Sequence, residues 1–157
     1  MRRLVYGVLP GLILAMAVAA GWMKWYEGTI RADEAESAET ISAATETTIR
    51  ILTFAPDTIE RDLAGAQQLM TDGFRAEFAA RARDRIIPDA KARNVTAVAE
   101  VPAAASVWAT RDHAAVLVFA DRTVTVGSAE PAEVDSSYRV TLDKVDGRWL
   151  VAGFEPV

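Results

Sequence analysis

Cysteine is absent from the chain of 157 residues, and histidine occurs once, at position 113. The missing cysteines exclude disulfides, thiolate nucleophiles, thiolate metal ligands and the lipidated cysteine of a bacterial lipoprotein. A single histidine excludes a multi-histidine metal site, and His113 falls in a predicted exposed turn. Motifs for nucleotide, calcium or zinc binding are also missing from the sequence, so we expect neither a cofactor nor a metal.

Positive charge is in short supply as well. The chain has 17 Lys and Arg against 22 Asp and Glu, which gives a net charge of −5. Nucleic acid is therefore a poor partner, because phosphate binding needs clustered basic side chains. One basic cluster, in residues 81–93, is interleaved with acidic residues. It favours a solvated helix face, with contact to membrane headgroups as the alternative.

The longest stretch without charge covers residues 4–23. Twenty helical residues at about 1.5 Å each span about 30 Å, which is the thickness of the hydrocarbon core of a membrane. Arg2 and Arg3 precede this stretch and acidic residues follow it, so we expect the N-terminus on the cytoplasmic side. The sequence thus predicts cytoplasmic residues 1–3, a transmembrane helix over residues 4–26 and a domain on the outer side of the membrane.

Two features of this apolar segment leave alternatives open. Residues 17–19, Ala-Val-Ala, match the cleavage pattern of a signal peptide, although apolar and aromatic residues continue beyond them. Small residues also recur every four positions, which places them on one helix face where a second transmembrane helix can approach closely. A single span that packs on no other helix is equally compatible with this pattern. The small residues are Gly7, Gly11, Ala15 and Ala19.

The remaining residues change from a helical pattern to a strand pattern. Apolar residues spaced by three or four predict a membrane-proximal helix within residues 27–56. Within residues 57–157, the rest of the domain, the same spacing predicts two shorter helices that end near Pro88. After Asn94 the period becomes two, which predicts antiparallel strands, the first ending at Pro102. This order indicates an α+β fold with the helices on one face of a curved antiparallel sheet.

The clearest local signal is Asp-Gly at residues 146–147, which predicts a two-residue hairpin turn. Such a turn pairs Leu142 with Val151 and Val140 with Gly153. One face of the hairpin then meets the helices, while the other is more apolar than solvent requires. That second face is a candidate partner contact, or is covered by the domain's own loops, and it carries Leu150, Ala152 and Phe154.

Three stretches, residues 57–66, 71–78 and 137–151, resemble those of the Mce-associated membrane proteins, and so does the closing Glu-Pro-Val at residues 155–157. The resemblance implies a single-span protein of the actinobacterial cell membrane. It also implies a nuclear-transport-factor-like (cystatin-like), cone-shaped outer domain, Mce transporter subunits as partners, and no catalytic residues. A family with the same layout, the assembly-factor subunits of type IV secretion systems, is the alternative.

We accordingly expect a noncatalytic accessory subunit that stabilises or helps assemble an Mce-type importer of fatty acids or sterols. The second hypothesis is a lipid-binding module, and the third is an isomerase-like enzyme, which needs a tyrosine and carboxylates in an apolar pocket. For that enzyme, Asp121 is conceivable, whereas the strand period places Tyr138 and Asp143 on opposite faces. A lipid-binding cone has six candidate lining residues: Phe74, Phe78, Leu117, Phe119, Tyr138 and Trp149.

Overall fold

The computed structural model describes residues 36–157. The predicted cytoplasmic residues 1–3 and the predicted transmembrane helix, with its small residues Gly7, Gly11, Ala15 and Ala19, lie outside the described residues. The described chain begins with a helix over residues 36–52. The elements that follow are α2 (Ile59–Gln67), α3 (Asp72–Arg81), the π-helix η1 (Ala82–Ile86), α4 (Ile87–Arg93), β1 (Val95–Ala109), β2 (His113–Val126), β3 (Ala132–Val145) and β4 (Arg148–Pro156).

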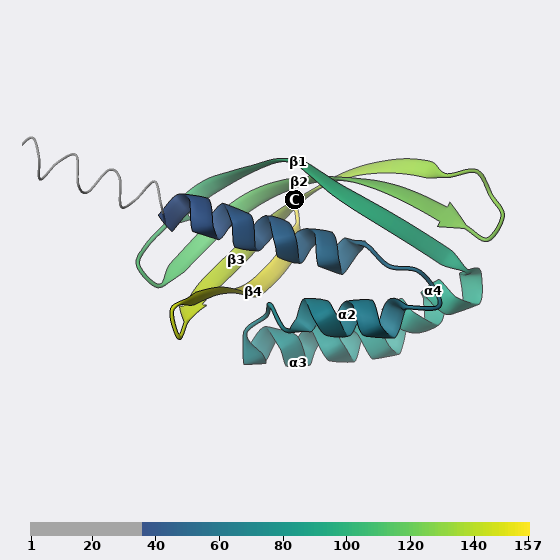
Figure 1. The fold of residues 1–157 in the computed structure, drawn as a ribbon, viewed down its shortest axis with the longest axis horizontal. Helices are drawn as coiled ribbons and strands as arrows, with labels where there is room; N and C mark the ends of the chain where they lie inside the picture. Colours follow the sequence, from purple (N-terminus) through teal and green to yellow (C-terminus); the bar gives the residue numbers. More distant parts are fainter. Residues whose placement is uncertain (1–35) are drawn as a thin grey trace, which may run out of the picture. The chain divides into compact units, whose positions relative to one another are not determined.

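The strands form one antiparallel sheet in the order β1-β2-β3-β4, so each strand pairs with its neighbour in the chain. Figure 1 shows the helix of residues 36–52 lying along the sheet, with α2 and α3 beside each other as a further layer and α4 leading into β1. The prediction of an α+β domain with helices packed on an antiparallel sheet is confirmed. Within residues 36–157, no helix is both long and apolar enough to cross a membrane.

Only one face of the sheet, here called the inner face, contributes to the main core. Alternate residues of β2, β3 and β4 point to this side and pack against the helices. The fully buried side chains of the helical layer include Ile59 and Leu63, while Met70 follows α2. The strands contribute Ala99, Ala114, Val116, Val118, Ala120, Tyr138, Val140, Leu142, Trp149 and Val151.

The helix of residues 36–52 packs on the domain through small side chains along most of its length and through Ile51 and Leu52 at its end. Its buried face contains Thr40, Ala44, Thr47 and Thr48. The hydroxyl of Thr40 donates to the carbonyl oxygen of Ser37 at 2.9 Å, and Thr47 bonds in the same way to residue 43. Two buried hydroxyls are therefore satisfied within the helix itself, so they need no partner in the apolar core.

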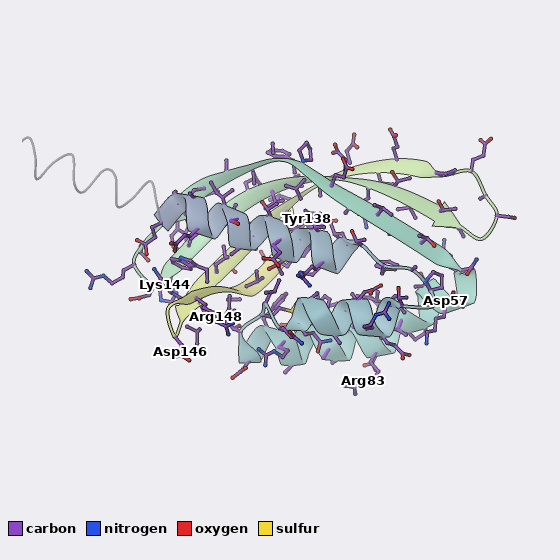
Figure 2. The ribbon with its side chains drawn as sticks, in the orientation of Figure 1. Asp57, Arg83, Tyr138, Lys144, Asp146 and Arg148 are labelled. Atoms are coloured by element: carbon purple, nitrogen blue, oxygen red, sulfur yellow. The ribbon has the colours of Figure 1, made fainter. Side chains whose placement is uncertain are left out.

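A charged contact joins this helix to the strands. Lys144 on β3 donates to the Glu36 carboxylate at 2.9 Å, and both side chains are about three-quarters buried. The Lys144 ammonium also lies 5.0 Å from the centre of the Trp149 ring on β4. A cation over an aromatic face is stabilised by the ring's quadrupole, so Lys144 connects the helix to the β3–β4 hairpin. Figure 2 labels Lys144 near the Asp146 turn.

The third helix continues beyond the predicted stop at Pro88. A π-helical turn, η1, follows α3, and α4 then runs to Arg93, where Asn94 ends it in a left-handed conformation with φ of 52°. Pro88 lies in the first turn of α4, where a missing N–H is tolerated. The proline is therefore part of a helix start rather than a helix end.

The first strand is also longer than predicted. β1 continues through Pro102, with irregular pairing to β2 between Glu100 and Ala103 and again between Ser106 and Trp108. A proline is compatible with a strand at the sheet edge or at a bulge, because no ladder hydrogen bond is lost there. Pro102 satisfies both conditions, since β1 is an edge strand.

The β3–β4 hairpin confirms most of its predicted register. Leu142 pairs with Val151 around the turn at residues 146–147, whose residues both have positive φ. The pairing then shifts after Leu142, so Val140 lies opposite Phe154 instead of the predicted Gly153. An extra residue in β4 causes this shift and turns the following side chains to the other face.

Candidate partner-binding surface

The face of the sheet opposite the helices, here called the outer face, is defined by strand alternation and register. On β1 and β2 its members pair as Glu100 with Asp121 and Trp108 with Ala115, and they do not belong to the main core cluster. β3 extends this face with residues that include Asp135, Arg139 and Asp143. The helices pack on the inner face. The outer face is therefore the side of the sheet on which a partner could bind.

One half of the outer face is apolar. Trp108, near the end of the edge strand β1, and Phe119, on the central strand β2, have exposed fractions of 48% and 44%, which are high for large aromatic side chains. The small residues of β1 lie opposite the large residues of β2, and Trp108 lies opposite a small one. We call this the apolar half, and its members are Ala103, Ala105, Trp108, Ala115, Leu117 and Phe119.

The other half is acidic. Glu100, Asp121 and Asp135 lie directly opposite one another across β1, β2 and β3, and Glu133 lies in the next row. We call these four residues the acidic half. Together with Arg122 and neutral residues, they line a cavity of about 280 Å³. Within the described residues, none of the four carboxylates forms an ion pair, and no group of three or more acidic or histidine side chains is arranged to hold a metal ion.

The three residues predicted as a partner contact do not form one exposed surface. Leu150 is buried, with an exposed fraction of 8%, while Ala152 and Phe154 are half-buried. The register shift moves Phe154 to the inner face, where its ring stacks on Tyr138 at a centroid distance of 4.4 Å. The prediction that Phe154 shares a face with Leu150 was therefore wrong, because a bulge reverses the alternation.

The six residues predicted to line a cone are divided between the two faces. Four of them lie in the main core with exposed fractions below 10%: Phe74, Phe78, Tyr138 and Trp149. Leu117 and Phe119 lie on the outer face, so their assignment to the same lining was wrong. Phe74 and Phe78 contact each other with ring centroids 6.2 Å apart. These aromatic side chains belong to a packed core.

A second cavity lies beside η1. Its volume is about 460 Å³, within the range of sites for small molecules. Arg85 and Asp89 are exposed at its border, and the other lining residues are apolar or small: Phe54, Ile86, Ala90 and Val95. No pattern in the sequence predicted this cavity. Two of its lining residues, Arg85 and Ile86, belong to the π-helical turn η1, a feature that is frequent at functional sites.

The residues considered for acid-base chemistry are far from forming one site. Tyr138 faces the core, whereas Asp121 and Asp143 belong to the outer face, in agreement with the alternation predicted for Tyr138 and Asp143. His113 begins β2, and its Nδ1 lies 2.8 Å from Asp143 Oδ1, with the His113 side chain exposed and that of Asp143 half-buried. The predicted exposure of His113 is confirmed. Its contact with Asp143 follows from strand register, which places the two residues opposite each other.

This arrangement of helices on a four-stranded antiparallel sheet has the fold of periplasmic secretion-system domains. The chain is similar to an IcmL-like type IV secretion system protein from Legionella pneumophila, with a TM-score of 0.65, 11% identity and coverage of 76% of this chain and 91% of that one. It is also similar to VirB8 of Agrobacterium tumefaciens, with a TM-score of 0.61, 14% identity and coverage of 76% and 90%. At such identities the likeness concerns the fold.

Sequence similarity defines the family more narrowly. The chain is 43% identical over 156 residues to the protein named outer membrane protein Rv1973 of Mycobacterium tuberculosis. The matched stretch covers 99% of this chain and 98% of that protein. The chain therefore belongs to the family of this mycobacterial protein. No family model matches the chain.

Proposed function

We propose that the protein is a noncatalytic accessory subunit that stabilises or helps assemble an Mce-type lipid importer in the cell envelope. The observation that carries this proposal is the outer face of the sheet, which exposes aromatic side chains that a solitary soluble domain has no reason to leave in water. The proteins that share its fold include type IV secretion system subunits, which supports a role within a multiprotein assembly. The resemblance of residues 57–66, 71–78 and 137–151 to Mce-associated proteins is our reason for proposing an Mce-type importer as that assembly.

The proposal includes a single span in the cell membrane, a cytoplasmic N-terminus and an extracytoplasmic domain. The charge-free residues 4–23, preceded by Arg2 and Arg3, support this topology. Intact-mass measurement of the mature protein should give a chain that begins at Met1 or Arg2. A start near Ala20 would show that the segment is a cleaved signal peptide.

Affinity purification from native membranes in mild detergent tests the accessory role. Transporter subunits should co-purify with the chain in a defined ratio, and recovery of the chain alone would argue strongly against the proposal. If the span itself docks on a transporter helix, Gly11→Leu should weaken co-purification, because a bulky side chain prevents close backbone approach. Membrane insertion and folding of the outer domain serve as controls for this variant.

A lipid-binding module with a nuclear-transport-factor-like cone is the second candidate, and the cavity beside η1 favours it. That cavity combines an apolar lining with the exposed guanidinium of Arg85, while the Asp89 carboxylate at its border already pairs with Arg93, so the cavity suits an amphiphile with an acidic head. Lipid extraction followed by mass spectrometry should then recover such a molecule from the wild type. Arg85→Glu should lose it, while Arg83→Glu, a similarly exposed control on the same helical turn, should retain it.

A further inference from the structure

We propose that the outer face of the sheet binds a segment of a protein partner in which basic side chains adjoin apolar ones. The inference rests on the proposed function, because it names the chemistry of the partner that an accessory subunit would hold. The two halves of the outer face supply independent arguments. From Glu100 to Trp108 the surface extends about 25 Å at the rise of a strand, which matches roughly eight extended residues of a partner.

The apolar half has the composition of a binding centre. Exposed tryptophan and phenylalanine are enriched where proteins associate, since each buries a large area at a low cost in side-chain entropy. Trp108 on β1 and Phe119 on β2 lie at opposite ends of the apolar half. Each faces an alanine on the neighbouring strand, Ala115 and Ala103 respectively. The alanines between them, such as Ala105, leave room for side chains of a partner to pack between the two rings.

The acidic half determines the charge of the partner. Like charges directly opposite one another on a sheet are unfavourable, and here Glu100, Asp121 and Asp135 occupy three successive strands in one row. No ion pair within the described residues compensates these carboxylates. Arg122 also borders the cavity of about 280 Å³ that they line, but it forms no ion pair with them, so lysine or arginine from a partner would enter the cavity and remove the remaining repulsion.

Other occupants fit this surface less well. A second copy that presented its own outer face would bring the same carboxylates and leave the charge uncompensated. An anionic membrane surface would be repelled by the acidic half. The basic cluster of a second copy is also less suitable, because three of its five basic residues, Arg81, Lys91 and Arg93, already pair with acidic side chains of their own chain.

Photo-crosslinking in native membranes tests the proposal with the full-length chain. A photoreactive amino acid replaces Ala105 in the apolar half, and the matched control places it at Ala80, an exposed alanine of α3. From position 105, mass spectrometry should identify a peptide of a different protein in which lysine or arginine adjoins apolar residues. The same peptide should be absent from the crosslinks at position 80.

Charge reversal supplies the second measurement. Asp121→Lys in the acidic half should lower the yield of the position-105 crosslink at least fivefold, whereas Asp84→Lys on η1 should leave it unchanged. Circular dichroism of each purified variant shows whether the domain remains folded. If Asp121→Lys unfolds the domain, Asp121→Asn combined with Asp135→Asn should still lower the yield, because it removes charge without adding bulk.

The outcomes separate this inference from the proposed function. A crosslink from position 105 to a lipid, to a second copy or to nothing overturns the inference, as does an unchanged yield in folded Asp121→Lys. If transporter subunits co-purify with the chain while any of these results holds, the accessory role stands, and the outer face is not the surface that binds the proposed segment. If the crosslinked basic and apolar segment belongs to a protein outside the transporter, the surface is right and the accessory role in lipid import is wrong.

Discussion

The two faces of the sheet are made from similar residues but have opposite environments. On β2, Val116 and Val118 of the inner face have exposed fractions of 0%, while Phe119, the next residue on the outer face, is 44% exposed. Helices pack on the first set, whereas Trp108 and Phe119 of the outer face remain about half exposed. The comparison indicates that the inner face supplies most of the stability of the domain, whereas the outer face is available for association.

Truncation on the two faces should give the largest difference. Leu142→Ala removes a fully buried side chain of the inner face and should lower the free energy of unfolding by about 2–5 kcal/mol. Phe119→Ala on the outer face should lower it by less than about 1 kcal/mol. Urea denaturation of the full-length variants in detergent, followed by tryptophan fluorescence, provides the measurement. Equal losses would mean that the outer face is packed as tightly as the core.

A smaller loss is expected where the outer face itself is crowded. A Cβ at Gly153 would lie 2.5 Å from the hydroxyl oxygen of Thr141, its neighbour on β3. Gly153→Ala should therefore destabilise the domain by about 1–2 kcal/mol. Combining it with Thr141→Ala removes the clash and should recover most of the loss in the same denaturation experiment. If the double variant is no more stable than Gly153→Ala, the loss of stability comes from the backbone and not from the contact with Thr141.

The charged contact that connects the helix of residues 36–52 to the strands should contribute less. Lys144→Ala removes the ion pair to Glu36 and the cation over Trp149, which we expect to cost about 1 kcal/mol. Arg81→Ala, which removes a more exposed pair to Glu77, should be nearly neutral. Thermal denaturation followed by circular dichroism can compare the two variants, and equal shifts would contradict the special role of Lys144.

The smallest effect should have the opposite sign. Asp121→Asn reduces the repulsion in the acidic half and should raise the free energy of unfolding by a few tenths of a kcal/mol at low salt. Because salt screens exposed charges, this gain should fade at high ionic strength. Asp84→Asn, outside the acidic half, should show no such salt-dependent gain. A loss of stability in Asp121→Asn would imply that the carboxylate has a favourable contact within the protein.

Sequence reasoning succeeded where a local signal decides the structure. The Asp-Gly pair at residues 146–147 needs positive φ at both positions, and that requirement alone fixed the turn and the pairing of Leu142 with Val151. The change of period after Asn94 correctly separated helices from strands. These features depend on a few neighbouring residues, so a single sequence is enough to predict them.

It failed where the answer depends on packing elsewhere in the chain. Both sets of alternate residues on β2 are apolar, so periodicity could not show that Leu117 and Phe119 belong to the outer face. The bulge in β4 has no sequence mark, yet it decides the position of Phe154. The acidic half was missed because its members come from three strands and become neighbours only through register.

The edge position of β1 affects whether this strand can pair with a strand of another molecule. An exposed edge of fifteen residues offers backbone donors and acceptors to any other strand, which is a common route to aggregation. In the described part of the chain, Phe54 occupies this edge at Ala97. Farther along, Pro102 provides no donor, and two irregularities interrupt the row. The β1 edge is therefore a poor template for a strand of another copy.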